Sequence, residues 1–285
     1  MLIMKKKWYK SKVFVITGAS GDIGSEVCRF FAPLGMRIYL LDLPNSPLES
    51  LVGELKELGA DYVEAINLDV TNREQIEVVL KKIGEKENYI DIIFNNAGIG
   101  SKCSITNKGR FEEYRKIMSV NVDGMWLVLQ AALPYIGRPS PTKRYPDRRE
   151  GQLIFSSSAA GKTGVPNMAA YAMSKSAIIA LADSIRLEYK MNGHKIDVIT
   201  SVSAPANTKF YSTPEMVNWV KGYQKKGFLF KFVEPQDVAK RVLKASRKGK
   251  KEIYVPRFWW LIGFLFVFSH SLIGNLLIKI EKTQK

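Results

Sequence analysis

Cysteine and histidine are scarce in this sequence, which has two of each among its 285 residues. Cys28 and Cys103 lie in segments predicted to be a helix and a loop, and their spacing fits neither a disulfide framework nor a metal site. We therefore expect a reducing compartment. His270 has no second ligand at a helical spacing, so we expect no bound metal ion.

Acidic side chains are also in short supply. The chain has 43 Lys and Arg against 27 Asp and Glu, a formal net charge of +16. Because 46% of the residues are hydrophobic and 25% are charged, a disordered, collagen-like or low-complexity chain is excluded. The excess charge by itself permits a nucleic acid, an anionic membrane or an acidic ligand. The bases gather in Lys5–Lys12, Gly137–Gly151 and Lys240–Arg257 with no recognition module for nucleic acid, so we expect no nucleic-acid partner.

A long apolar run is missing near the N-terminus. Lys5, Lys6 and Lys7 lead almost directly into an apolar strand, so no secretory signal peptide is predicted. At the other end, the segment Phe258–Ile278 is apolar except for a few polar residues in its second half. As a helix it would rise about 30 Å, at ~1.5 Å per residue, which matches the thickness of a bilayer core.

This tail predicts attachment to a membrane. Trp259 and Trp260 lie where aromatic residues of an interfacial belt are expected, and bases are more numerous before the tail than after it. That bias places the catalytic domain on the cytoplasmic side. A re-entrant or monotopic segment, or a tail packed on its own domain or across a dimer, remains an alternative. We divide the chain into a domain over 1–256 and a tail over 257–285.

Between Val13 and about residue 205, short β-branched runs alternate with longer helical patterns, which is typical of βαβ units. This rhythm predicts an α/β fold with a doubly wound, mostly parallel sheet in three layers, and a ligand crevice at the carboxyl ends of the strands. The predicted strands are Lys12–Thr17, Arg37–Asp42, Tyr62–Asp69, Ile90–Asn95, Gln152–Ser156, Lys195–Ser201 and a closing strand Glu252–Val255.

Two segments interrupt this rhythm. The segment Gly137–Gly151 is rich in proline and basic residues, and we interpret it as a surface excursion, with a basic docking patch as the alternative. Between Ala206 and Val233, aromatic residues lie among turn residues, which suits a lid over an apolar ligand or a pair of helices packed on the core.

A glycine-rich loop follows the first predicted strand and precedes a helix. Its glycines allow a tight turn and let backbone N–H groups approach a pyrophosphate at the positive end of the helix. Asp42 ends the second strand, where a carboxylate accepts hydrogen bonds from the ribose and repels a 2′-phosphate. We therefore predict NAD rather than NADP. The loop residues assigned to the cofactor are Thr17, Gly18, Ser20, Gly21, Asp22, Ile23 and Gly24.

Tyr171 and Lys175 are four residues apart on the predicted helix Ala169–Tyr189, so they share one face. An ammonium beside a phenol stabilises the phenolate, and we expect it to lower the tyrosine pKa towards neutrality. Just upstream, the fifth strand ends in Ser156, Ser157 and Ser158, which offer a hydroxyl to orient a carbonyl. On these residues alone, a structural Tyr/Lys pair is the alternative.

Together these motifs resemble the short-chain dehydrogenase/reductase family. The resemblance rests on the loop Thr17–Gly24, Asp69 before Val70, the run Asn95-Asn96-Ala97-Gly98, Asn121, Ser158, and Tyr171-x-x-x-Lys175, in family order over about residues 12–256. It implies a Rossmann fold, a catalytic set and further cofactor ligands. The implied catalytic residues are Ser158, Tyr171, Lys175 and Asn121, and the further cofactor-binding residues are Asp69, Val70, Asn96, Ala97, Gly98, Tyr171, Lys175 and Thr208.

The resemblance implies a role for each of the four catalytic residues. Tyr171 would be the acid/base, Ser158 would polarise the substrate oxygen, and Lys175 would hold the nicotinamide ribose. Asn121 would anchor a proton-relay water. The chain departs from the family after the sixth strand, where a Pro-Gly turn is replaced by Pro205-Ala206 before Thr208.

We therefore expect an oxidoreductase that transfers a hydride between NAD(H) and the carbinol or carbonyl carbon of an apolar, lipid-like alcohol or ketone at a membrane surface. The alternatives are a sugar-nucleotide epimerase or dehydratase of the same fold and a noncatalytic dinucleotide-sensing scaffold. The resemblance also implies a homodimer or a homotetramer.

Overall fold

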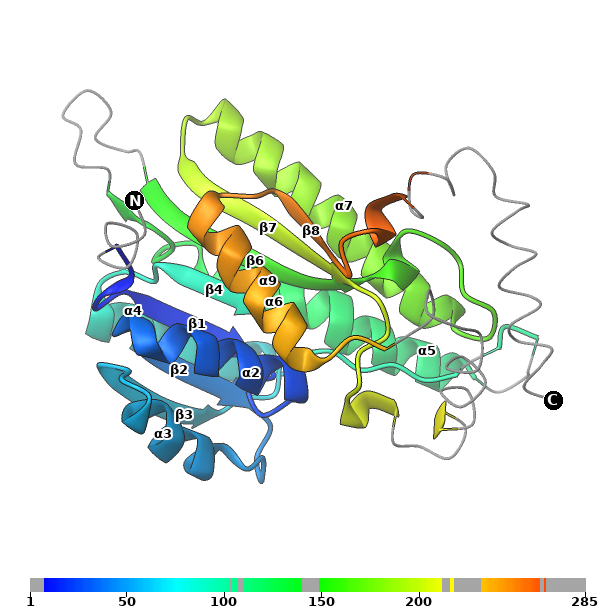
Figure 1. Cartoon of the computed structure of the whole chain (residues 1–285), viewed down its shortest axis with the longest axis horizontal. Coiled ribbons are helices and arrows are strands. Elements are labelled where there is room, and N and C mark those ends of the chain that lie inside the picture. Colours follow the sequence, from blue (N-terminus) through cyan, green and yellow to red (C-terminus); the bar gives the residue numbers. More distant parts are fainter. Residues whose placement is uncertain are drawn as a thin grey trace.

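The chain forms a parallel sheet between two layers of helices (Figure 1). The computed structural model describes residues 8–102, 104–106, 110–139, 149–211, 216–217, 232–261 and 264. The parallel strands are β1 (Val13–Thr17), β2 (Arg37–Asp42), β3 (Tyr62–Asn67), β4 (Ile92–Asn95), β6 (Arg149–Ser158), β7 (Lys195–Ser203) and β8 (Glu252–Val255). This arrangement confirms the doubly wound α/β prediction. Three carboxyl ends differ from the prediction, because β3 stops before Asp69 whereas β6 and β7 run on to Ser158 and Ser203. Three starts differ as well, at Val13, Ile92 and Arg149.

The strand order β3-β2-β1-β4-β6-β7-β8 reverses direction between β1 and β4. The chain winds outwards from β1 to β3 and then returns to the other side of β1. At such a switch point the connections on the two sides diverge, which opens a crevice at the carboxyl ends of the strands. The strand order alone therefore predicts a ligand site at the carboxyl ends of β1 and β4.

Alternating side chains of each strand supply two separate hydrophobic cores. In β1, Phe14 and Ile16 face one core, whereas Val13 and Val15 face the other. Buried apolar residues at every second position are what a sheet covered on both faces requires. The first core lies under α2 (Asp22–Phe31), α3 (Leu48–Glu57) and α9 (Pro235–Lys248), and the second under α4 (Arg73–Glu87), α6 (Gly124–Ala132) and α7 (Ala169–Met191).

The helix α5 (Phe111–Met118) is followed directly by a helical turn, Ser119–Asp123, and then by α6. The middle part has the wider π-helical turn, which inserts one extra residue per turn and rotates a side chain out of the regular pattern. Asn121 lies in this turn and is fully buried.

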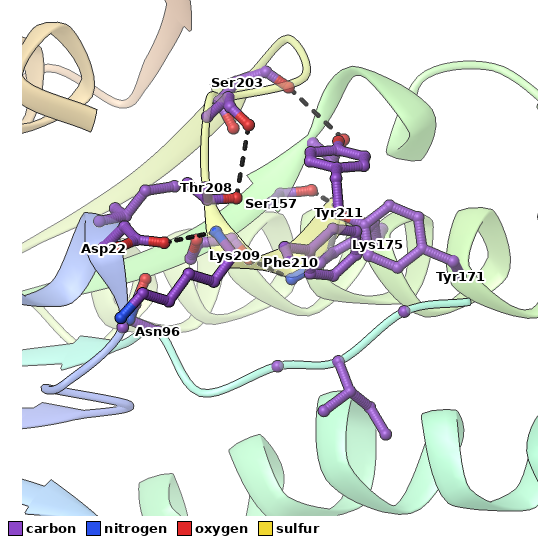
Figure 2. A pocket seen from close by; sticks show the side chains of 18 of the residues that line it. Asp22, Asn96, Ser157, Tyr171, Lys175, Ser203, Thr208, Lys209, Phe210 and Tyr211 are labelled. Atoms are coloured by element: carbon purple, nitrogen blue, oxygen red, sulfur yellow. Dashed lines mark hydrogen bonds between the residues drawn. The ribbon is translucent and has the colours of Figure 1, made fainter. Parts of the chain in front are cut away.

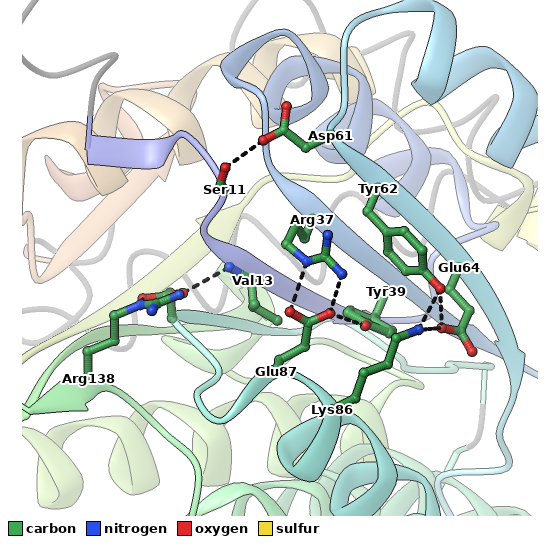
Figure 3. Close-up of polar contacts among 11 residues, drawn as sticks. Ser11, Val13, Arg37, Tyr39, Asp61, Tyr62, Glu64, Lys86, Glu87 and Arg138 are labelled. Atoms are coloured by element: carbon green, nitrogen blue, oxygen red, sulfur yellow. Dashed lines mark hydrogen bonds and ion pairs between the residues drawn. The ribbon is translucent and has the colours of Figure 1, made fainter.

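Polar contacts join α4 to the outer strands at the amino edge of the sheet (Figure 3). Arg37 at the start of β2 donates two hydrogen bonds, of 2.8 and 2.7 Å, to the carboxylate of Glu87 at the end of α4. The hydroxyl of Tyr39 donates to the same carboxylate, and Lys86 lies 2.9 Å from Glu64 of β3. These contacts fasten α4 to the outer strands at the edge opposite the crevice.

Asp91 makes a second clamp at this edge and is completely buried. It accepts a hydrogen bond from the backbone N–H of Val13 at 2.9 Å and two from the guanidinium of Arg138, at 2.6 and 2.9 Å. Lys12 lies 3.1 Å away. Arg138 belongs to the short strand β5 (Arg138–Pro139), which pairs antiparallel with the start of β6. Within the described residues, the two ends of the Gly137–Gly151 excursion are therefore adjacent, whereas 140–148 lie outside them.

Most of the tail and much of the expected lid lie outside the described residues, which include only 206–211, 216–217 and 232–233 of the lid. Of the tail they include 257–261 and 264. Within the part of the chain that the structure describes, no helix has the length and apolar character needed to cross a membrane.

The basic cluster Lys240–Arg257 is continuous in sequence but divided in space. Lys250 and Lys251 precede β8 at the amino edge of the sheet, whereas Arg257 follows it at the carboxyl edge. Only Arg257 therefore leads directly into the tail.

Candidate active site

A cavity of about 510 Å³ lies at the carboxyl edge of the sheet, where the switch point predicts a crevice (Figure 2). The loop before α2, the segment after β4, the end of β6, the start of α7 and the segment after β7 all contribute to its wall. Of the predicted site residues, those that line it are Ser20, Gly21, Asp22, Ile23, Asn96, Gly98, Ser158, Tyr171, Lys175 and Thr208.

The loop between β1 and α2 can exist only with glycine at two positions. Gly18 has a φ of +64°, which an L side chain rarely adopts. A Cβ on Gly24 would lie 2.2 Å from the carbonyl oxygen of Gly18. Asn96 donates its side-chain amide to that same carbonyl at 3.0 Å. These contacts bend the loop so that Gly21 and the first residues of α2 face the cavity.

Thr17 holds the loop against β4 from below. Its hydroxyl accepts hydrogen bonds from the backbone N–H groups of Asn96 and Ala97, at 3.1 and 3.2 Å. Thr17, Gly18, Gly24 and Ala97 do not line the cavity, so they shape the cofactor loop from beneath it.

Asp42 lies at the end of β2, beside the loop, as predicted. One of its oxygens accepts hydrogen bonds from the backbone N–H and the hydroxyl of Ser20, at 2.8 and 2.6 Å. The other accepts from the N–H of Leu43 at 2.8 Å. Its carboxylate thus fixes the loop conformation and places a negative charge beside the start of α2.

Asp69 and Val70 lie away from this cavity. Asp69 accepts hydrogen bonds from the backbone N–H and the hydroxyl of Thr71, at 2.8 and 2.7 Å, and so stabilises the turn into α4. Val70 packs against Gly124, where a Cβ would lie 2.7 Å from the carbonyl oxygen of Val70. The structure therefore gives both residues contacts that shape the sheet edge.

The structure brings Ser158, Tyr171 and Lys175 together in the cavity. Ser158 ends β6 and lines the cavity with Tyr171; its hydroxyl donates to the carbonyl of Ser203 at 3.4 Å and accepts from the N–H of Ala160 at 3.2 Å. The ammonium of Lys175 donates to the carbonyl oxygen of Ser156 at 3.0 Å and lies 5.7 Å from the centre of the Tyr171 ring. Ser157 donates its hydroxyl to the backbone carbonyl of Lys175 at 2.9 Å. The end of β6 thus fixes the first turns of α7.

Burial controls the protonation of both groups. Loss of solvent raises the pKa of Tyr171 to about 12, although the hydroxyl of Ser158 acts in the opposite direction. Loss of solvent also lowers the pKa of Lys175 to about 8. The expectation that Lys175 depresses the pKa of Tyr171 is therefore wrong for this geometry. The ammonium lies beside the ring, and desolvation outweighs its attraction for a phenolate.

Asn121 acts on the segment after β4. Its side chain accepts from the N–H of Ile99 at 2.8 Å and donates to the carbonyl of Ile99 at 2.9 Å. The same amide lies 2.9 Å from the hydroxyl of Ser174, which donates to the carbonyl of Tyr171 at 2.8 Å. A Cβ on Gly98 would lie 3.2 Å from Asn121 and 3.3 Å from the Lys175 ammonium, so a side chain at this position would crowd both groups.

The segment after β7 covers the cavity (Figure 2). The N–H of Lys209 donates to the carboxylate of Asp22 at 2.7 Å, which ties this segment to the start of α2. The ring of Phe210 lies 5.4 Å from that of Tyr171 and contacts the backbone of Gly100. The sequence pattern indicated aromatic residues in this segment, as a lid or as helices packed on the core, but it did not indicate the Lys209 contact or the close approach of Phe210 to Gly100.

The residues around this cavity fit a nicotinamide dinucleotide. The N-terminus of α2 faces the cavity through Gly21, which has no side chain to exclude a phosphate, and the helix end carries a partial positive charge. Tyr171 and Lys175 lie at the other end of the same space, as an elongated cofactor requires.

Comparison with known proteins agrees with this geometry. The model of the short chain dehydrogenase family matches residues 12–215. The chain belongs to the short chain dehydrogenase family. As a member of this family, it is an oxidoreductase with a nicotinamide-type cofactor site.

Curated relatives and a solved structure extend the comparison. "Dehydrogenase/reductase SDR family member 7C" of Xenopus tropicalis is 29% identical over 262 residues, which cover 89% of this chain and 79% of the relative. "Oxidoreductase UcpA" of Salmonella typhimurium is 33% identical over 191 residues, which cover 66% and 67%. The structure of a short chain dehydrogenase/reductase from Burkholderia phymatum in complex with NAD superposes with a TM-score of 0.78 at 21% identity, covering 93% and 95% of the two chains. At that identity the match shows the fold.

Proposed function

We propose that the chain transfers a hydride between NAD(H) and the carbinol or carbonyl carbon of an apolar alcohol or ketone at a membrane surface. The observation that carries this proposal is the convergence of Ser158, Tyr171 and Lys175 in one 510 Å³ cavity that also contains the start of α2. The relatives described above are named as dehydrogenases, reductases or oxidoreductases, which favours this reaction over epimerisation or a scaffold role.

Tyr171 supplies the proton in the reducing direction. When bound, the reduced cofactor supplies the hydride that the carbonyl carbon receives, and the C=O double bond becomes a C–O single bond. The substrate oxygen takes its proton from the Tyr171 hydroxyl, which a pKa of about 12 keeps protonated at neutral pH. Solvent then returns a proton to Tyr171, so the overall reaction consumes one proton. The oxidising direction reverses each transfer.

Ser158 and Lys175 stabilise the charge that develops during this transfer. The hydroxyl of Ser158 lies in the wall of the same cavity as the phenol of Tyr171, and in the proposed reaction it donates to the same substrate oxygen. Below its pKa of about 8, Lys175 carries a positive charge 5.7 Å from the centre of the Tyr171 ring, which would offset part of the negative charge left by proton transfer without bringing the Tyr171 pKa near neutrality. Preorganised charges of this kind act strongly in a cavity shielded from water.

Two further features support the choice of cofactor and substrate. The carboxylate of Asp42, fixed on Ser20, would repel a 2′-phosphate, which favours NAD over NADP. The rings of Phe210 and Tyr211 line the cavity edge-on to each other, with centres 4.9 Å apart, and the buried ring of Phe232 packs edge-on against Tyr211 at 5.2 Å. These rings favour a substrate with a large apolar body, which the apolar tail would hold near its source. We place the catalytic domain in 1–256, on the cytoplasmic side.

The Tyr171→Phe variant tests the proposal. It removes the proton donor but keeps the ring that packs on Phe210, so we expect turnover to fall by about 10²–10⁴-fold with NADH affinity almost unchanged. NADH absorbance with a panel of long-chain and polycyclic ketones measures turnover, and NADH fluorescence measures binding.

Tyr114→Phe is the matched control, because it loses a hydroxyl at a tyrosine that does not line the cavity. Its turnover should stay close to that of the native protein. Native turnover in Tyr171→Phe would refute the mechanism, and absence of turnover in the native protein over the whole panel would favour a noncatalytic role.

A further inference from the structure

The tail leaves the fold at the same edge as the mouth of the cavity. β8 pairs in parallel with β7, and their last paired residues are Val255 and Ser203. The N–H of Ala204 donates to the carbonyl of Val255 at 2.7 Å. Both Ser203 and Ala204 line the cavity. The tail therefore begins one hydrogen bond away from the wall of the active site.

The first turn of the tail exposes large apolar side chains. Trp260, Leu261 and Phe264 are 51%, 44% and 52% exposed, whereas Trp259 turns inwards and packs against the core. Figure 1 shows this orange-red turn beyond the end of β8, on the side of the molecule where the strands end. We call Trp260, Leu261 and Phe264 the apolar rim.

Cations accompany the apolar rim at this edge. Arg257 and Lys209 are both exposed, one between β8 and the rim and the other on the segment that covers the cavity. Aromatic and aliphatic groups beside long basic side chains are the composition of surfaces that enter the headgroup region of anionic bilayers. The apolar sequence continues beyond the rim to Ile278.

We propose that the apolar rim docks on an anionic lipid bilayer with the mouth of the active site facing the lipid, so that the substrate enters from the bilayer. This inference rests on the proposed function for the identity of the site. It adds the orientation of the domain and the route of the substrate. Only Pro256 separates Val255, the last residue of β8, from the tail. If the bilayer holds the tail, the domain therefore has little freedom to turn the mouth of the cavity away from the bilayer.

Depth-dependent fluorescence quenching tests the orientation. Two full-length variants keep a single tryptophan, Trp260 in one and Trp8 in the other, with the remaining tryptophans replaced by Phe. Trp8 precedes β1 and so reports on the opposite edge of the sheet. The vesicles contain phosphatidylcholine brominated on its acyl chains together with a smaller share of phosphatidylserine. We expect strong quenching of Trp260 and almost none of Trp8.

A pair of substitutions tests the route of the substrate. The double change Trp260→Ser and Phe264→Ser removes apolar rim surface without touching the cavity, and we expect vesicle affinity to fall by at least about tenfold. KM for a ketone dissolved in the vesicles should rise, whereas kcat with a short water-soluble ketone should stay unchanged. Met191→Ser is the control, because Met191 is 83% exposed at the end of α7, away from the mouth.

Several results would overturn this inference. They are quenching of Trp8 as strong as that of Trp260, no quenching of Trp260 in vesicles that bind the chain, no vesicle binding, and a KM that the double change leaves unaltered. Loss of the proposed function is seen separately, as absent turnover of the native protein in detergent, whatever the quenching pattern.

Discussion

At the scale of single residues, the chemistry depends on the unequal effects of burial on two neighbouring groups. Burial keeps Tyr171 protonated far above neutral pH and brings the pKa of Lys175 down to about 8. The raised pKa of Tyr171 suits proton donation. The lowered pKa of Lys175 means that its ammonium loses its charge just above physiological pH. Neither direction follows from the Tyr-x-x-x-Lys spacing, because spacing specifies a shared helix face and does not specify solvent exclusion.

The pH dependence of ketone reduction follows from these two groups. Between about pH 6 and pH 8 Tyr171 is protonated and Lys175 is charged, so kcat/KM should be nearly constant. As the pH rises through about 8, Lys175 loses its charge and the rate should fall, although Tyr171 is still protonated. Initial rates of NADH oxidation at saturating cofactor give the profile. A rate that increases through this range would contradict the assigned roles.

At the scale of elements, the sequence predicts those parts that depend on local patterns. The glycine loop, the helix that carries Tyr171 and the alternating strand residues all appeared where their patterns placed them. The contacts that complete the site join distant segments. Lys209 binds Asp22 across the cavity, and Asn121 reaches Ile99 only because a π-turn rotates it inwards. Neither contact has a local sequence signal, because both depend on how whole elements pack.

The clamp at Asp91 allows a test of element packing. Asp91→Ala leaves the guanidinium of Arg138 and the N–H of Val13 without their acceptor at the amino edge of the sheet. Arg138 is 36% exposed and recovers part of its hydration, so we expect a loss of about 2 kcal/mol in the free energy of unfolding and roughly 5 °C in Tm. Chemical denaturation and thermal melting measure both quantities.

Glu77→Ala is the control for that variant. The pair Arg73–Glu77 is exposed on both sides, so its loss should change the free energy of unfolding by less than ~0.5 kcal/mol. Equal effects of the two substitutions would show that Asp91 does not clamp the strands.

At the scale of the whole molecule, the amino and carboxyl edges of the sheet have different roles. Ion pairs fasten the amino edge, and the carboxyl edge holds both the cavity and the start of the tail. The positive charge of the sequence divides accordingly, with Lys250 and Lys251 at one end of β8 and Arg257 at the other. The linear sequence indicated that the whole basic cluster Lys240–Arg257 lies beside the tail. In the fold, Arg257 lies there, together with bases that other segments bring to the carboxyl edge.

Truncation tests this division of tasks. A chain that ends at Leu261 keeps Trp259, which packs on the core, and should turn over a water-soluble ketone within about twofold of the native rate. The same chain keeps only part of the apolar rim and should sediment with vesicles much less than the full chain. A chain that ends at Pro256 also loses the indole of Trp259 and should be less stable by about 1–2 kcal/mol. Sedimentation of the shorter chains at the native level would show that the tail is not the attachment.

The central claim is that Tyr171 and its neighbours direct a hydride to a carbonyl carbon, and isotope transfer tests it most directly. The native protein is incubated with a ketone and NADH that carries deuterium at the transferable position of C4, and the alcohol product is analysed by mass spectrometry. The account predicts an alcohol with deuterium on its carbinol carbon, formed by the native protein and nearly absent with Tyr171→Phe. An alcohol without deuterium, or one formed equally by both proteins, would contradict it.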